Sequence, residues 1–137
     1  MKNSEFKIKE NIALTENVYK MTLLGDTEGI LPGQFINIKL SGLYLRRPIS
    51  VCDVEGNSLV IIYKVVGRGT EKMAQMKEGS LDVLTHLGNG YSLKESGDLP
   101  LLLGGGVGVP PMYYLAKKLL EEGKKVSVIL GFNTKSE

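Results

Sequence analysis

The sequence predicts an antiparallel β-barrel followed by a partial β-α-β unit of a nucleotide-binding domain, and two patterns along its 137 residues support this fold class. Residues 1–97 hold about six short apolar or alternating segments, with turn signals about every ten residues, which is typical of a small all-β barrel. Residues 98–137 hold an apolar strand, a glycine-rich turn, an amphipathic helix and a second apolar strand. We therefore expect a barrel domain over 1–97 and a truncated α/β domain over 98–137.

The barrel strands follow from the placement of apolar residues. In one of them Ile36, Ile38 and Leu40 share a face, with polar residues between them. In the first strand the alternation breaks near Asn11. A short helix is expected at 71–76, between two glycine-containing segments. The six expected strands are 6–14, 18–23, 35–40, 47–52, 59–66 and 80–87.

The α/β unit follows from a change of pattern after Gly97. Buried strands are expected at 101–103 and 126–130. Between them, apolar residues at 112, 115, 116, 119 and 120 have the spacing of one helix face. Two parallel strands with one helix leave a sheet face and an edge uncovered. We therefore expect either a chain that is truncated or a homo-oligomer that forms through this incomplete unit.

Composition excludes several classes of protein. The formal net charge is +2 with no basic run, so we expect neither nucleic acid nor a membrane surface as a partner. A single cysteine, Cys52, and a single histidine, His86, cannot build a structural zinc site, and we expect no metal. The cysteine count and the lack of a signal peptide or a membrane-spanning run predict a cytoplasmic location.

Two segments of the barrel domain suggest a phosphate-bearing ligand. In Arg46-Arg47-Pro48-Ile49-Ser50, a guanidinium can bind a diphosphate while the serine hydroxyl serves a nearby polar atom. Taken alone, this pentapeptide is more typical of a surface arginine pair at a strand start. In Gly67-Arg68-Gly69-Thr70, glycines let backbone amides approach a phosphate, although an ordinary capped turn has the same letters. Because this turn closely follows Ile62-Tyr63-Lys64, the strand and the turn together form a candidate flavin site.

The third segment is the glycine-rich turn from Gly104 to Pro111. It fits neither the Gly-x-Gly-x-x-Gly fingerprint nor a P-loop. A strand, four glycines and a helix start nevertheless bring backbone close to a pyrophosphate or a nicotinamide. We favour this interpretation over a turn that needs glycine only for packing. Cys52 is expected to be an inert buried thiol, and His86 a loop histidine rather than a catalytic base.

Taken in order along the chain, these segments resemble the ferredoxin–NADP reductase superfamily, and within it the electron-transfer subunits of B-type dihydroorotate dehydrogenase. The resemblance rests on Arg47-Pro48-Ile49-Ser50, Ile62-Tyr63-Lys64, Gly69-Thr70, Leu87-Gly88-Asn89-Gly90 and Gly104 to Pro111. It implies an FAD-binding barrel before a nicotinamide-nucleotide domain, with NAD(H) as substrate. It also implies a cysteine-rich segment that holds a 2Fe-2S cluster, and an FMN-containing dihydroorotate dehydrogenase catalytic subunit as partner in pyrimidine biosynthesis.

The resemblance also implies a role for each matching residue. Arg47 would bind the FAD diphosphate, and Ser50, the one candidate catalytic residue, would lie near the reactive N5 side of the flavin. The backbone of Ile62, Tyr63 and Lys64 would line the ring and the ribityl chain. Lys64 stands where the family is expected to have an arginine. The complete set of implied cofactor-binding residues is Arg47, Pro48, Ile49, Ser50, Ile62, Tyr63, Lys64, Gly69 and Thr70 for FAD, and Gly104, Gly105, Gly106 and Gly108 for the nicotinamide.

The cysteine count departs from that family, because a 2Fe-2S cluster generally needs four thiolates and the chain has only Cys52. We therefore expect a C-terminally truncated, FAD-binding electron-transfer subunit that is not fully competent alone. Two alternatives stay open at this point. One is a ferredoxin- or hydrogenase-linked NAD(P)H reductase subunit, and the other is a non-catalytic flavin-binding or assembly fragment.

Overall fold

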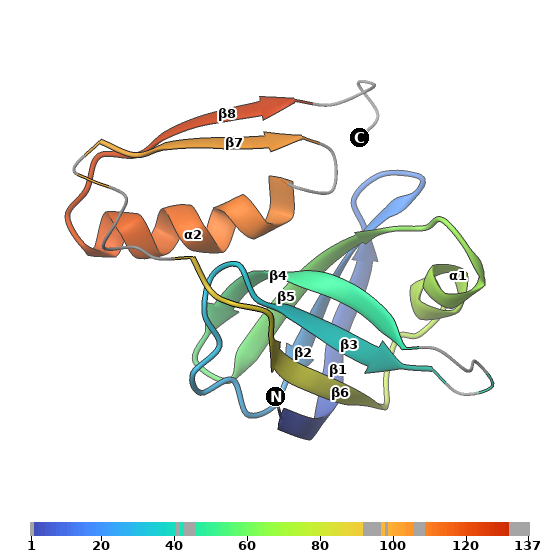
Figure 1. The fold of residues 1–137 in the computed structure, drawn as a ribbon. Coiled ribbons are helices and arrows are strands. Elements are labelled where there is room, and N and C mark those ends of the chain that lie inside the picture. Colours follow the sequence, from blue (N-terminus) through green and yellow to red (C-terminus); the bar gives the residue numbers. More distant parts are fainter. Residues whose placement is uncertain are drawn as a thin grey trace.

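The computed structural model describes residues 2–40, 42, 46–91, 97, 99–105 and 109–131. A closed barrel of six strands lies beside a smaller unit made of one helix and a two-stranded sheet (Figure 1). This arrangement confirms the predicted fold class. The elements are β1 (Lys2–Ala13), β2 (Val18–Leu24), β3 (Phe35–Lys39), β4 (Arg47–Glu55), β5 (Ser58–Lys64), α1 (Arg68–Ala74), β6 (Ser80–Leu87), β7 (Leu101–Gly105), α2 (Val109–Glu121) and β8 (Ser127–Gly131).

The barrel strands pair in the order β1-β2-β5-β4-β3-β6 and close through β6 and β1, always antiparallel. Side chains on the inner faces fill the barrel. Ile36, Ile38 and Leu40 are all buried, as their alternation predicts. Leu59, Ile61 and Tyr63 point inward from β5 in the same alternating way.

A shift of register explains the broken alternation in the first strand. The pairing of β1 with β2 changes between Ile8 and Glu10, which is the signature of a β-bulge. Beyond this point the inward-facing set changes phase, so Asn11 is buried whereas Ile12 is exposed. The bulge therefore places a carboxamide inside the barrel.

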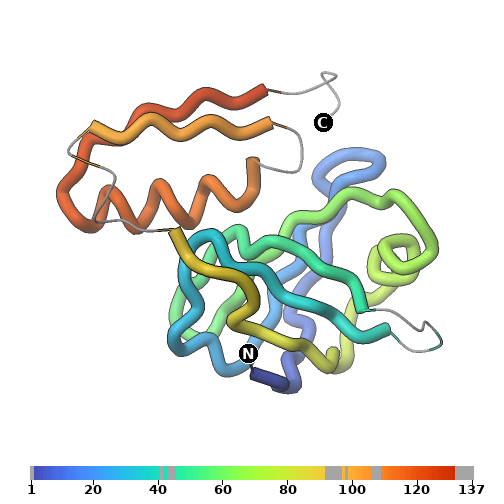
Figure 2. The backbone as a smooth tube through the Cα atoms, in the orientation of Figure 1, coloured from blue at the N-terminus to red at the C-terminus, as the bar shows by residue number. Residues whose placement is uncertain are grey.

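Helix α2 lies between the two-stranded sheet and the barrel (Figures 1 and 2). Leu115 and Leu119 of α2 pack with Leu102 of β7, as the helical spacing predicts, but Leu120 is exposed. On the other side of the helix, the buried Tyr114 hydroxyl donates a hydrogen bond of 2.7 Å to the Ile30 carbonyl oxygen. The helix therefore joins the sheet to the barrel.

The parallel sheet is much less buried than the sequence predicts. Its strands pair in register from Leu101 with Ser127 to Gly105 with Gly131, and all five residues of β8 are exposed. An apolar strand is buried only where another layer covers it, and among the described residues α2 covers one face of this sheet. The domain limits at residues 97 and 98 stay a prediction.

No helix within the described part of the chain is long and apolar enough to cross a membrane.

Candidate functional site

The candidate site begins where β4 and β5 separate. Within the described strands, their pairing runs from Glu55 with Ser58 to Val51 with Ile61, and shifts register at Cys52. Beyond Val51, residues 47–50 pair with β3, and beyond Ile61, residues 62–64 pair with β2. Bulges bend a strand and end its pairing, so the predicted flavin-lining segments flank the place where the barrel wall opens.

The two ends of β4 present different side chains at this opening. Ser50 and Pro48 are exposed, whereas Arg47 and Ile49 are half-buried, as alternation along a strand requires. Ser50 lies opposite Phe35 of β3, so these two residues share the outward face. The Ser50 hydroxyl is therefore accessible to a ligand lying on the outside of the barrel wall.

Arg47 and Gly69 lie against each other although 22 residues separate them in the sequence. A Cβ atom added to Gly69 would overlap the Arg47 side chain at its Nε, Cδ and Cζ atoms. Gly69 is buried in the first turns of α1. The absence of a side chain at Gly69 is thus what allows the guanidinium to lie beside the helix.

The neighbouring arginine has a different role. Arg46 donates from its Nη1 atom to the carbonyl oxygens of Asn37 and Asp82, and its Nη2 atom lies 3.3 Å from Asp82 Oδ1. Arg46 therefore holds β3 and β6 together from outside. Of the two arginines that the sequence places at the strand start, only Arg47 lies against Gly69.

Thr70 closes its own turn rather than pointing to a distant group. Its Oγ1 atom accepts hydrogen bonds from the amides of Val66 and Gly67, at 2.8 and 3.1 Å, and lies 3.1 Å from the Gly67 carbonyl oxygen. This bonding starts the helix at Arg68, three residues before the predicted start. The threonine hydroxyl thus bonds within its own turn, and its role in holding the FAD phosphates stays a prediction.

Tyr63 contributes its backbone, not its side chain, to the opening. Its ring stacks on Tyr19 with centroids 5.9 Å apart, and its hydroxyl donates a 2.9 Å hydrogen bond to Asn11 Oδ1. Burial raises the pKa of the Tyr63 phenol to about 12. Ile62 and Lys64 are half-buried on the other face of β5.

The glycine-rich turn lies at the carboxyl end of β7. Gly104 and Gly105 pair with Leu130 and Gly131, while Gly106 and Gly108 lie outside the described residues. The carboxyl ends of parallel strands are where α/β proteins bind ligands. Because Pro110 and Pro111 have no amide hydrogen, the start of α2 offers few donors to a phosphate.

Cys52 is buried, as the sequence predicts, whereas His86 lies in strand β6 and not in the loop that the sequence predicts for it. Burial raises the pKa of the Cys52 thiol to about 11, so it stays protonated and unreactive. His86 has a positive φ of 60° and lies 2.7 Å, through Nε2, from the Glu28 carbonyl oxygen. The Thr85 hydroxyl lies 2.7 Å from its Nδ1 atom. Among the described residues no group of three His, Cys, Asp or Glu side chains could hold a metal ion.

The structure adds two residues that the sequence did not single out. Phe35 shares the outward face with Ser50, and its ring packs against Gly88. An aromatic residue two positions after the Pro32-Gly33 turn was the available signal. Asn11 joins the site to α1 from inside the barrel, and the broken alternation near it was the signal there.

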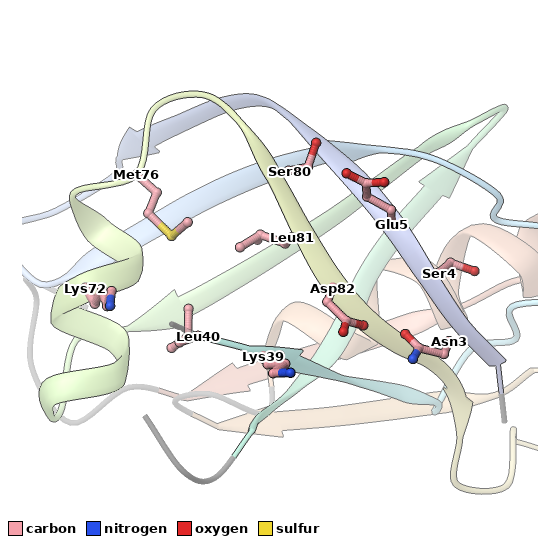
Figure 3. A pocket seen from close by; sticks show the side chains of 10 residues that line it. All are labelled: Asn3, Ser4, Glu5, Lys39, Leu40, Lys72, Met76, Ser80, Leu81 and Asp82. Carbon is pink, nitrogen blue, oxygen red and sulfur yellow. The ribbon is translucent and has the colours of Figure 1, made fainter. Parts of the chain in front are cut away.

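A cavity of about 550 Å³ lies elsewhere, between α1 and the strands β1, β3 and β6 (Figure 3). None of the predicted site residues lines it. Its lining combines acidic and basic side chains with apolar ones. The lining residues are Asn3, Ser4, Glu5, Lys39, Leu40, Lys72, Met76, Ser80, Leu81 and Asp82.

Comparison with known proteins finds curated relatives that match the whole chain. It is 44% identical to the dihydroorotate dehydrogenase B (NAD(+)) electron transfer subunit of Fusobacterium nucleatum and 42% identical to that of Bacillus pumilus. Both alignments cover 100% of this chain and 57% of the relative, so the chain spans little more than half of their length. No family model matches the sequence.

Solved structures agree with this relationship. An NADH-dependent reduced ferredoxin-NADP oxidoreductase superposes with a TM-score of 0.86 and 31% identity, over 96% of this chain and 49% of that chain. A ferredoxin NADP+ reductase from Neisseria gonorrhoeae, solved with bound FAD and NADP, has a TM-score of 0.81 over 99% of this chain and 60% of its own. At 18% identity, this second likeness shows a shared fold.

Proposed function

Since this chain is a homologue, over its whole length, of the electron-transfer subunits of dihydroorotate dehydrogenase B, we propose that it binds FAD and passes on electrons that come from NADH. The acceptor in this proposal is an FMN-containing dihydroorotate dehydrogenase catalytic subunit, and the pathway is pyrimidine biosynthesis. Bound FAD supplies the chemistry that connects a two-electron hydride donor with one-electron carriers.

The observation that supports this proposal most directly is the opening between β4 and β5, with Arg47 held against Gly69 at its end. The separated strand edges offer backbone groups to a planar ring, and a guanidinium fork suits a diphosphate. The missing side chain at Gly69 leaves room for the Arg47 guanidinium beside the start of α1. In this proposal Ser50 lies beside the flavin ring and Lys64 near its ribityl chain.

The glycines at the end of β7 take the nicotinamide in this proposal. Gly104 and Gly105 let the ring approach the strand end, and the prolines at the start of α2 leave few amides for a pyrophosphate. The proposed nicotinamide-binding residues also include Gly106 and Gly108, which lie outside the described residues. The 137 residues do not fit a 2Fe-2S cluster, because they contain one cysteine, Cys52, where such a cluster generally needs four thiolates, and Cys52 is buried.

Flavin titration of the purified chain tests the proposal. Replacing Arg47 by alanine removes a charge-assisted contact with the diphosphate, so FAD affinity should fall about tenfold to a hundredfold. Arg46→Ala is the matched control, since Arg46 bonds to β3 and β6, and it should leave FAD affinity near the wild-type value. A wild-type chain that binds no FAD, or an Arg47→Ala chain that binds it normally, would contradict the proposal.

A ferredoxin-linked reductase is the second candidate, because the NADH-dependent reduced ferredoxin-NADP oxidoreductase is 31% identical to this chain. Affinity capture with the tagged chain distinguishes the two functions. Recovery of a dihydroorotate dehydrogenase catalytic subunit supports the first, and recovery of a ferredoxin or of another reductase subunit supports the second.

We also propose that a second copy of the chain covers the exposed β7–β8 sheet, giving a homo-oligomer. Leu103 and Ile129 expose more than half of their surface there, and exposed apolar strands at a sheet edge are sites of pairing. Light scattering should show a dimer that Ile129→Lys converts to a monomer. A wild-type monomer would rule the dimer out.

A further inference from the structure

Asn11 is a buried carboxamide whose hydrogen-bonding groups are all used. It is 4% exposed. Its Oδ1 atom accepts from the Tyr63 hydroxyl at 2.9 Å, and its Nδ2 atom donates to the carbonyl oxygens of Met73 and Met76, at 2.7 and 2.8 Å. The Asn11 carbonyl oxygen also accepts from Lys77 Nζ at 2.9 Å. Every one of these partners lies more than 50 residues away in the sequence.

These bonds connect the two parts of the proposed FAD site. Tyr63 lies in the segment of β5 that lines the opening, and Met73 lies near the end of α1, the helix that begins beside Gly69. Asn11 therefore spans from the ring-lining strand to the helix that carries the diphosphate end of the site. It does so from inside the barrel, without facing the opening.

Helix α1 depends on contacts of this kind for its position. It has 7 residues, and only Gly69 and Met73 among them are buried. A helix of about two turns is not stable by itself in water, so tertiary contacts set its placement. Asn11 Nδ2 supplies such contacts, because it donates to the Met73 carbonyl oxygen in the last turn of α1 and to the Met76 carbonyl oxygen just past the helix.

The carbonyl oxygens of Met73, in α1, and Met76, just past the end of α1, fix which way the Asn11 carboxamide points. Because a carbonyl oxygen only accepts, Nδ2 has to face this pair, and Oδ1 is left to accept from the Tyr63 hydroxyl. A reversed amide would place Oδ1 against two other acceptors. The stacked Tyr19 ring, with Lys77 Nζ 5.6 Å from its centroid, packs beside Tyr63.

We propose that Asn11 and Tyr63 are positioning residues that set the distance between the ring-lining edge of β5 and the Gly69 end of α1, and thereby control the affinity for the diphosphate half of FAD. This inference rests on the proposed FAD-binding function. Asn11 and Tyr63 would affect FAD affinity by positioning the two parts of the site, whereas Arg47 would bind the diphosphate directly through its guanidinium.

The test compares FAD with riboflavin, which has the same ring and no phosphate. Asn11→Asp replaces the Nδ2 donor group with an acceptor that faces two carbonyl oxygens, and Tyr63→Phe removes the donor to Asn11 Oδ1 while keeping the ring. We expect FAD to bind about tenfold more weakly to Asn11→Asp and about threefold to tenfold more weakly to Tyr63→Phe, with riboflavin affinity unchanged. The ³¹P resonances of bound FAD should shift in both variants.

Thr85→Val is the matched control. Thr85 is fully buried in β6, and its hydroxyl meets Lys2 and His86 rather than α1. This variant should lose stability yet keep the FAD-to-riboflavin affinity ratio and the ³¹P shifts. If Asn11→Asp does not fold, Tyr63→Phe decides the question.

The outcomes separate the two proposals. A wild-type chain that binds neither flavin removes the proposed function and this inference together. A wild-type chain that binds FAD, with Tyr63→Phe leaving both the affinity ratio and the ³¹P shifts unchanged, overturns the positioning role alone. Parallel weakening of FAD and riboflavin with unmoved ³¹P shifts also overturns it, because that result indicates a general structural role.

Discussion

The barrel and the α/β unit bury their apolar residues to very different extents. In the barrel, strands from all sides contribute to one cluster in which Phe6, Ile36 and Leu59 are fully buried. In the α/β unit, the described buried cluster contains only Leu102, Leu115 and Leu119. A closed barrel has no edge and encloses its own core, whereas a two-stranded sheet with one helix covers one of its faces.

The smaller unit depends on the barrel for part of its burial. Tyr114 extends from α2 into the barrel cluster and donates to the Ile30 carbonyl oxygen. Lys117, one turn further along α2, reaches Asp53 and the Val54 carbonyl oxygen of β4. The comparison indicates that the barrel fixes the helix, and the helix in turn fixes β7 and its glycine turn.

Two strand isoleucines, one in the barrel and one in the α/β unit, give the sharpest test of this difference in burial. Ile36 is fully buried in β3, and Ile129 is 57% exposed in β8. Ile36→Ala should lower the free energy of unfolding by about 2–5 kcal/mol, because it leaves a cavity in a packed core. In the monomer, Ile129→Ala should lower it by less than about 0.5 kcal/mol. Urea denaturation at a protein concentration low enough to keep the chain monomeric measures both, and similar losses under that condition would contradict the difference in burial.

The sequence predicts the barrel better than the unit that follows it. Strict alternation, as at Ile36 and Ile38, identifies a strand with one face inside, and the structure confirms these residues as core. The run from 126 to 130 is also mostly apolar and predicts a buried strand, yet every residue of β8 is exposed. Burial of a strand depends on which layers cover it, and this information is not present in the strand's own residues.

The same limit explains what the sequence shows of the candidate site. Arg47 and Gly69 are individually visible as motif residues, but their contact follows from the way α1 folds back over the barrel. Asn11 looks like a break in a pattern, because its partners Tyr63 and Met73 are distant in sequence. A local pattern predicts an element, while long-range pairing decides which polar groups it satisfies.

Alkaline pH should weaken the barrel through Tyr63. The fold raises the pKa of this phenol from 10 to about 12, so it favours the neutral form. The resulting stabilisation is complete below pH 10 and is lost as the pH rises through 12. Urea midpoints should therefore fall over this range, and Tyr63→Phe should flatten the decline. Tyr113→Phe, which removes an exposed phenol of α2, should not, and a flattening there would point to the α/β unit instead.

The Lys117–Asp53 pair gives the smallest expected effect and addresses the junction between the two regions. Lys117 Nζ lies 3.0 Å from Asp53 Oδ1, and this hydrogen bond raises the pKa of Lys117. A double-mutant cycle with Lys117→Met and Asp53→Asn should give a coupling energy of about 1 kcal/mol or less, since the lysine is partly exposed. The coupling should be present below pH 10.5 and disappear as the pH rises through the raised value.

The exposed Lys118–Glu121 pair of α2 is the control for this cycle, because it lies within one helix and should contribute nothing to the junction. Hydrogen exchange then locates the effect. Lys117→Met should increase exchange in α2 and β7 while the barrel strands keep their protection, because the barrel encloses its own core. If the barrel amides lose protection equally, the two regions unfold as one unit, and the barrel depends on the helix as much as the helix depends on the barrel.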